Sequence, residues 1–202
     1  ENKEITSLIG KFVYYKVTTN GYELREASAD EVDKHFAAIR PAKIQTPKRD
    51  LSVKEIKPLD KIGFEDSAAF GVKATNLATL HTLDFPEGTV PSGHAVPFHF
   101  YHAFMKHNGL YDKARAMLGT ESFKENRDEQ IKELKAFRKL VKSGSMPDWM
   151  MGNLARLQKS FANGQEIRCR SSTNNEDLPD FSGAGLYDSF THKSDEGHLA
   201  KT

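Results

Sequence analysis

The chain has 202 residues, of which 38% are hydrophobic and 28% are charged, a composition typical of globular domains. Its formal net charge of +1 gives no overall attraction to nucleic acid or to an anionic membrane. No apolar run approaches the ~20 residues of a membrane-spanning helix, and the charged first residues carry no apolar signal-peptide core. The single cysteine excludes an internal disulfide framework, and we therefore expect a cytoplasmic protein without membrane or nucleic-acid partners.

Residues 1–40 are expected to form a β-hairpin followed by a helix. Residues 11–17 (KFVYYKV) are rich in aromatic and β-branched residues, Asn20-Gly21 suits a tight turn, and residues 22–25 would return as the partner strand. Ser28 and Glu31 have the spacing of a capping box, which predicts a helix start. So few elements bury little core, and this segment would suit the end of a preceding domain.

Residues 41–60 change in composition and are expected to be an extended linker. Three prolines interrupt a stretch that also carries Lys43, Lys48, Arg49, Lys54 and Lys57. The alternative is a basic patch for a polyanion. The linker interpretation is favoured because no aromatic residues alternate with the charges.

Residues 61–202 mix helical and strand patterns, which predicts an α+β fold. Helices are expected over residues 72–83, 98–108, 125–142 and 148–161, and a strand over residues 166–170. We expect the apolar stripes of these helices to face a core, and the stripes include Tyr101, Ile131, Leu134 and Trp149. A loop rich in Gly, Ser and Asn follows the strand and runs to Tyr187.

Two segments carry chemistry suited to phosphate. Gly71-Val72-Lys73 precedes a helix, whose free N–H groups and positive dipole end, together with the lysine charge, would suit a polyphosphate. A solvated lysine is the alternative. On the strand, Arg168 and Arg170 would point away from the core, and two serines follow them. A surface hairpin with satisfied arginines is the alternative here.

Other candidate groups favour structural roles. His94, His99 and His102 lie close together in sequence, but no carboxylate or cysteine completes a recognisable metal site, so we expect no metal there. Cys169 alternates inward on the predicted strand, and a buried, unreactive thiol is the better interpretation.

Three motifs resemble, in the same order, those of the pyruvate phosphate dikinase and phosphoenolpyruvate synthase family. Gly71-Val72-Lys73-Ala74-Thr75-Asn76-Leu77 is similar to its G-G-K-G-A-N-L motif, and residues 90–96 (VPSGHAV) are similar to V-P-P-G-F-V-V. The third motif comprises Arg170-Ser171-Ser172, Glu176-Asp177-Leu178-Pro179, Phe181-Ser182-Gly183-Ala184-Gly185 and Asp188-Ser189-Phe190. The resemblance covers about residues 60 to 202, with a helical insertion before the third motif.

The resemblance implies the N-terminal lobe of an ATP-grasp domain in a phosphotransferase that phosphorylates a histidine on a swivelling domain and then an acceptor such as pyruvate. It implies that Lys73, Arg170, Gly185 and Ser189 contact the ATP phosphates and that Arg170 is also catalytic. Val72 departs from the family's second glycine. In the family, the carboxylates that hold Mg²⁺ lie on a second lobe, so we expect residues 61–202 to be a truncated domain that is inactive alone. The alternative is a non-catalytic nucleotide-binding or regulatory module.

Overall fold

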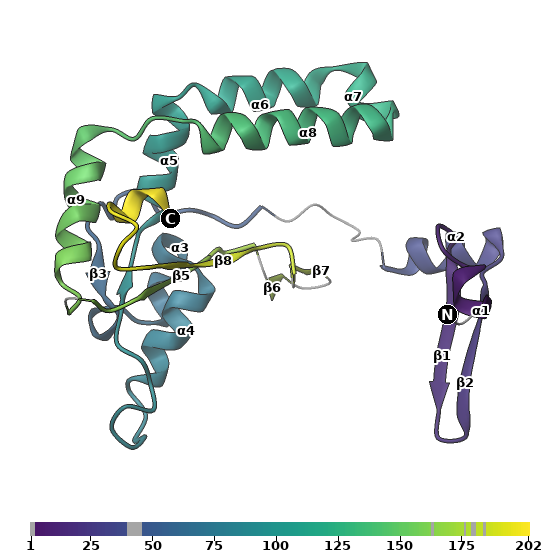
Figure 1. Ribbon diagram of the computed structural model, residues 1–202, viewed down its shortest axis with the longest axis horizontal. Helices are drawn as coiled ribbons and strands as arrows, with labels where there is room; N and C mark the ends of the chain where they lie inside the picture. The colour runs from purple at the N-terminus through teal and green to yellow at the C-terminus, as the bar shows by residue number, and fades with distance from the viewer. Residues whose placement is uncertain (1–2, 40–45, 163, 176, 179–180, 184) are drawn as a thin grey trace. The chain divides into compact units, whose positions relative to one another are not determined.

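The computed structural model describes residues 3–39, 46–162, 164–175, 177–178, 181–183 and 185–202. The chain divides into two compact units, residues 1–45 and residues 46–202, and each is considered by itself (Figure 1). The predicted linker over residues 41–60 crosses this division, and its residues 41–45 lie outside the described part of the chain.

The first unit is the predicted hairpin and helix. It contains α1 (Lys3–Thr6), the antiparallel strands β1 (Val13–Thr18) and β2 (Gly21–Glu26), and α2 (Ala29–Ile39). Thr18 pairs with Gly21, so the two turn residues are Thr19 and Asn20, and Gly21 opens β2 with a φ of +146°. The hairpin and helix are confirmed, with the turn one residue earlier than the Asn-Gly pair predicts.

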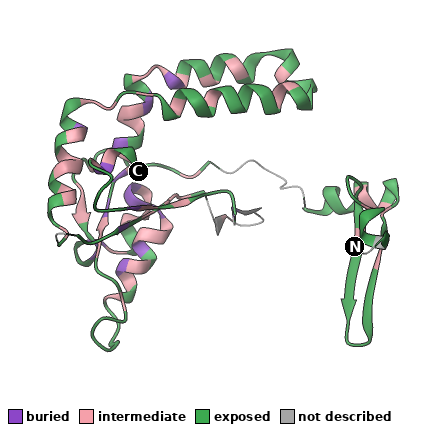
Figure 2. Ribbon diagram, viewed as in Figure 1, coloured by how far each residue is buried: buried purple, intermediate pink, exposed green. Residues whose placement is uncertain are grey.

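One face of this hairpin is apolar and exposed. The exposed fractions of Tyr15, Val17 and Tyr22 are 63 to 64%, and α2 has no buried residue. Figure 2 shows the two strands almost entirely as exposed and intermediate residues. This agrees with the prediction that so few elements do not bury a core of their own.

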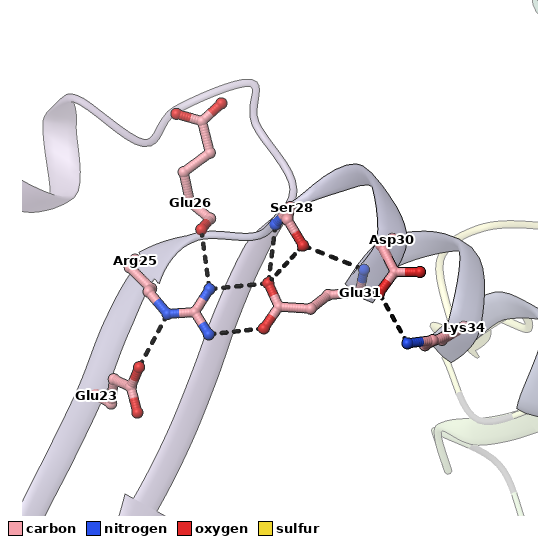
Figure 3. A network of polar contacts seen from close by, with 7 residues as sticks. All are labelled: Glu23, Arg25, Glu26, Ser28, Asp30, Glu31 and Lys34. Atoms are coloured by element: carbon pink, nitrogen blue, oxygen red, sulfur yellow. Dashed lines mark hydrogen bonds and ion pairs between the residues drawn. The ribbon is translucent and has the colours of Figure 1, made fainter.

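A polar network joins β2 to the start of α2 (Figure 3). The Ser28 amide donates to the Glu31 carboxylate at 2.9 Å, and the Glu31 amide donates to Ser28 Oγ at 3.3 Å, which confirms the capping box. Arg25 donates to both oxygens of the same carboxylate at 2.9 and 2.7 Å, and its Nε donates to Glu23 at 2.9 Å. The hydrogen bond from Arg25, followed by the Ser28 amide, lowers the pKa of Glu31 from 4.5 to about 2.

This network predicts acid sensitivity of the first unit. Because the folded-state pKa of Glu31 is depressed, its contribution to stability is present above pH about 4.5 and is lost as the pH falls through about 2. The amide resonances of β1 and β2 can be followed during an acid titration. They should show loss of the contact between the hairpin and α2 as the pH falls from about 4.5 to about 2. Glu31→Gln should remove this component, and Glu133→Gln, on an exposed helix of the other unit, should leave it unchanged. Equal acid profiles for wild type and Glu31→Gln would contradict the assignment.

The second unit combines helices with short antiparallel strand pairs, as the predicted α+β class requires. The strand pairs are β3 (Lys57–Pro58) with β4 (His94–Ala95), β5 (Ile167–Arg170) with β8 (Ser189–His192), and β6 (Asp177–Leu178) with β7 (Phe181–Ser182). The α-helices are α3 (Ser67–Phe70), α4 (Val72–Leu80), α5 (Phe98–His107), α6 (Leu110–Gly119), α7 (Glu121–Glu125), α8 (Arg127–Lys142) and α9 (Asp148–Lys159). The described residues also form the 3₁₀ turns η1 (Leu59–Lys61), η2 (Phe64–Asp66) and η3 (Leu199–Lys201).

The main apolar core lies around the junction of α3 and α4. Phe70 is only 1% exposed and is buried in one cluster together with Leu59, Ile62, Ala69, Ala78 and Ala95. This cluster joins η1, α3, α4 and β4, so burial of apolar surface fixes the end of α3. The residue that follows Phe70 is Gly71, and the core therefore anchors the turn that carries the first phosphate-type motif.

Three helical details differ from the sequence-based expectations. Ile131 and Leu134 of α8 were expected to face a core, but they are 56% and 44% exposed. In α5 the buried residues are Phe100 and Met105, whereas Tyr101 is 52% exposed, and α6 was not predicted at all. The helices packed against α8 are α6 and α7 (Figure 1), so its apolar positions are only partly covered. None of the helices in the described ranges combines the length and apolar character needed to cross a bilayer.

Candidate functional site

The β5–β8 pair places arginines opposite hydroxyl groups. In its register Arg170 faces Ser189 and Arg168 faces Thr191, so the four side chains share one face of the ribbon. The register puts Ile167 on the other face, opposite His192, and both are buried, as predicted for the inward side of this strand. The sequence analysis missed β8, because its pairing partner lies about 20 residues earlier in the chain.

The two arginines of this face differ in their partners. The Arg168 guanidinium donates to Thr191 Oγ1 at 2.8 Å and is therefore held across the strand pair. Arg170 is exposed, and among the described residues its guanidinium has no hydrogen-bond or ion-pair partner. Of the two, Arg170 is consequently the better placed to receive an anionic ligand, because it has no such bond to release.

The chain that leaves β5 docks directly onto the start of α4. Ser172 Oγ donates to the Phe70 carbonyl at 2.7 Å and accepts from the Ala74 amide at 3.0 Å. The Val72 amide donates to the Thr173 carbonyl at 3.0 Å. We call these three hydrogen bonds the Ser172 clamp. They join segments that are about 100 residues apart in sequence and bring the Gly71–Lys73 turn beside the chain that carries Arg170.

Gly71 is the position at which this contact needs glycine. Its φ of +84° favours glycine, and a Cβ added there would lie 2.5 Å from the Ser172 carbonyl carbon and 2.6 Å from Ser172 Oγ. No Cβ fits at such distances unless the backbone shifts. Gly71 therefore allows the two backbones to approach closely.

The clamp corrects one expectation about α4. The sequence suggested that the first amides of this helix are free to bind phosphate, but the amides of Val72 and Ala74 already donate to Thr173 and Ser172. The loop after β5 thus caps α4 from a distant part of the chain, and these two amides are not available to a ligand while the cap is in place. Phosphate binding at this end of α4 would therefore depend more on side chains, and Lys73, half-buried in the first turn, is the cation there.

The two remaining predicted site residues, Ser189 and Gly185, differ in how the structure connects them to Arg170. Ser189 is brought to Arg170 by the strand register. Gly185 is exposed with a φ of +79°, and the Leu186 amide beside it donates to the Gly183 carbonyl at 3.1 Å. The parts of the third motif at residues 176, 179–180 and 184 lie outside the described residues. The structure therefore joins Lys73, Arg170 and Ser189 through the clamp and the strand pair, whereas Gly185 lies four residues before Ser189 on the connecting loop.

Sequence reasoning missed the clamp residues as organising elements. Ser172 was noted only as one of two serines after the arginines, and Thr173 was not noted. The sequence did contain one indication of such a contact. Gly71 precedes the helix and has no side chain to cap it, so the first amides of the helix need hydrogen-bond acceptors from elsewhere. Which segment supplies the partner depends on tertiary contacts, and a single sequence does not reveal it.

The histidines and the cysteine occupy structural surroundings. The His94 ring packs against Phe161, the His99 ring against Trp149, and His102 Nδ1 lies 3.2 Å from the Tyr111 hydroxyl. Within the ranges the structure describes, no three His, Cys, Asp or Glu side chains are placed to hold a metal ion. Partial burial raises the pKa of the Cys169 thiol against a smaller lowering effect of Arg168, which favours the unreactive protonated form.

Comparison with known proteins places this chain in a family. Residues 67–201 match the family described as pyruvate phosphate dikinase, AMP/ATP-binding domain. The chain belongs to this family. The match contains the Gly71–Lys73 turn, the Ser172 clamp and the β5–β8 pair, so every predicted site residue lies inside the AMP/ATP-binding domain.

Three curated relatives are similar over most of the chain. The probable phosphoenolpyruvate synthase of Methanocaldococcus jannaschii is 30% identical over 152 residues, which are 73% of this chain. The phosphoenolpyruvate synthases of Aquifex aeolicus and Pseudomonas aeruginosa are 29% and 28% identical over 65% and 68% of the chain. The chain spans only 12 to 18% of the length of these relatives.

Proposed function

We propose that this chain is the ATP-binding portion of a dikinase-type phosphotransferase, and that Lys73, Arg170, Gly185 and Ser189 hold the ATP phosphates. The observation that carries the proposal is the Ser172 clamp, because it joins two segments that separately carry a cation suited to phosphate. Family membership supports the choice of an adenine nucleotide.

The donor set fits a polyphosphate. An ammonium group, a planar guanidinium and a hydroxyl are the donors that phosphate oxygens accept from, and Arg170 and Ser189 stand opposite each other on one ribbon face. ATP would supply the transferable phosphoryl group. Arg170 would orient it and stabilise the charge that spreads over its oxygens during transfer, and Lys73 would add a second positive charge from the α4 side.

Magnesium belongs to the proposal only indirectly. The described residues of this site offer cations and hydroxyls, and hard divalent cations prefer carboxylate, carbonyl and water oxygens. We therefore expect Mg²⁺ to be held by the ATP phosphates and by carboxylates of a second lobe. This chain would neutralise the phosphate oxygens that the metal leaves exposed.

The wider reaction follows from the same family. We propose that residues 61–202 form the N-terminal part of an ATP-grasp domain, which in the longer protein phosphorylates a histidine on a swivelling domain and then an acceptor such as pyruvate. Because the chain spans 12 to 18% of its relatives, we expect it to bind ATP without turning it over. The longer protein should form a phosphohistidine when it is given ATP and magnesium.

Arg170 and Arg168 provide a matched test of the phosphate site. Arg170→Ala should weaken ATP binding about 10- to 100-fold, the effect of losing hydrogen bonds to a charged group. Arg168→Ala removes the same charge two residues away on the same ribbon face, but its guanidinium is engaged by Thr191, so the loss should be severalfold smaller. Calorimetric titration with ATP measures both values. Equal losses in the two variants would contradict the special role of Arg170.

The alternative is a non-catalytic nucleotide-binding or regulatory module. The Val72 substitution in the glycine motif favours it, because a side chain there restricts backbone approach to a ligand. Both alternatives predict ATP binding, so binding does not separate them. Radiolabelled ATP supplied to the longer protein does: transfer of label to a histidine supports the enzyme, and stable binding without transfer supports the module.

A further inference from the structure

We propose that residues 46–50 are a basic strap across the nucleotide site and that Arg49 binds the terminal phosphates of a nucleoside triphosphate. This inference rests on the proposed function of the Lys73–Arg170 site and adds a binding residue from outside the segment that matches the family, which begins at residue 67. The sequence favoured an extended, solvated linker here, and in the structure residues 46–50 are hydrogen-bonded to the rest of the unit at two points.

The first attachment is to the loop that forms the Ser172 clamp. Asn174, which follows Ser172 by two residues, donates from its Nδ2 to the Lys48 carbonyl at 2.8 Å. This hydrogen bond holds the backbone immediately before Arg49. A continuous series of contacts therefore runs from the strap through Asn174 and Thr173 to the Val72 amide, immediately before Lys73.

The second attachment lies on the other side of Arg49. The Asp50 amide donates to the Ala68 carbonyl of α3 at 2.7 Å, and the Asp50 carboxylate accepts from the Ser52 amide at 2.8 Å and the Ser52 hydroxyl at 2.6 Å. Arg49 is exposed between two residues whose backbones are both hydrogen-bonded to the site region. Such a fixed backbone lowers the conformational entropy lost when the side chain binds a ligand.

Arg49 and Tyr187 both belong to the electrostatic surroundings of the Tyr101 hydroxyl on α5. Burial is the largest cause that raises the pKa of the Tyr101 hydroxyl, and Tyr111 and Tyr187 raise it further by smaller amounts. The positive charge of Arg49 lowers the same pKa. Arg49 and Tyr187 thus both act on one hydroxyl of α5, and Tyr187 precedes Ser189 by two residues. Arg49 therefore shares its electrostatic surroundings with the loop that leads to Ser189, while the neighbouring Lys48 is hydrogen-bonded to the clamp loop.

A third cation changes the class of ligand that suits the site. Lys73 and Arg170 alone would serve one or two phosphate groups, whereas an added guanidinium on the strap favours a chain of phosphates with more negative charge. The strap should consequently favour ATP over AMP.

The test compares Arg49→Ala with Lys54→Ala, a variant that removes the same charge from an exposed position five residues further along. Calorimetric titrations use the full chain with ATP, AMP and inorganic tripolyphosphate. Arg49→Ala should weaken ATP and tripolyphosphate binding about threefold to tenfold and change AMP binding less. Lys54→Ala should bind all three as wild type does. Asn174→Ala, which frees the strap at Lys48, should reproduce part of the Arg49→Ala loss.

The outcomes separate this inference from the proposed function. One outcome is that wild type binds ATP, that Arg170→Ala no longer binds it, and that Arg49→Ala binds it like wild type. This outcome overturns the strap inference and leaves the phosphate site standing. An equal loss in Arg49→Ala and Lys54→Ala, or an equal loss for AMP and ATP, also overturns it. If wild type binds neither ATP nor tripolyphosphate, both proposals fail. Circular dichroism melting of each variant identifies any loss that comes from unfolding.

Discussion

Replacing Gly71 by alanine is expected to lower the free energy of unfolding of the second unit by about 3 to 5 kcal/mol and to abolish ATP binding. Two costs add up. A φ of +84° disfavours any residue with a Cβ, and the new Cβ would lie 2.5 Å from the Ser172 carbonyl carbon. The backbone cannot relax easily, because Phe70 is fixed in the core and Val72 is hydrogen-bonded to Thr173. Urea unfolding of the full chain measures the change in stability.

Gly88 offers a matched control for the first of these costs. It has a φ of +81°, and a Cβ added there would have no neighbour within 4 Å. Gly88→Ala should therefore cost only the backbone strain, about 1 to 2 kcal/mol, and leave ATP binding intact. If the two alanine variants lose the same stability, the close approach of Ser172 to Gly71 does not contribute and this account of the site is wrong.

The second large effect is expected for Ser172→Ala. This change removes the hydroxyl that donates to the Phe70 carbonyl and accepts from the Ala74 amide, so both backbone groups lose a partner. Loss of a helix-capping hydroxyl and of a second hydrogen bond should lower the free energy of unfolding by about 1 to 3 kcal/mol. ATP binding should weaken severalfold, because Lys73 is then held less firmly beside the chain that carries Arg170.

The neighbouring serine is the control for this variant. Ser171 Oγ is buried and has no hydrogen-bond partner in the part of the chain that the structure describes. Removing a buried hydroxyl without a partner relieves a desolvation cost, so Ser171→Ala should be neutral or slightly stabilising. The same urea titrations compare the two. A Ser171→Ala variant that is destabilised as much as Ser172→Ala would show that the clamp is not what distinguishes these adjacent serines.

Local patterns explain which parts of the fold could be predicted. The hairpin and the capping box at Ser28 and Glu31 depend on residues within a few positions of each other, and both form as expected. The alternation on β5 correctly separated Ile167 from the arginines. β8 was missed because its pairing partner β5 lies about 20 residues earlier in the chain, outside any local pattern.

Long-range packing explains what could not be predicted. An apolar stripe on α8 indicates that one face seeks cover, but it does not say whether the fold covers it, and Ile131 and Leu134 remain exposed. The Ser172 clamp joins residues about 100 positions apart, and the strap contact between Asn174 and Lys48 spans an even longer separation. The choice of candidate site residues thus comes from the sequence and stays a prediction, while the hydrogen bonds that connect their segments come from the structure.

The central claim is that the Gly71–Lys73 turn and the Arg170–Ser189 strand pair form one ATP site. Its most direct test is a titration of ¹⁵N-labelled chain with ATP, followed by the amide resonances of Lys73, Arg170 and Ser189. One site predicts that all three resonances shift along a single binding curve with one dissociation constant. Shifts confined to one of the two segments, or separate dissociation constants for Lys73 and for the strand pair, would contradict the claim.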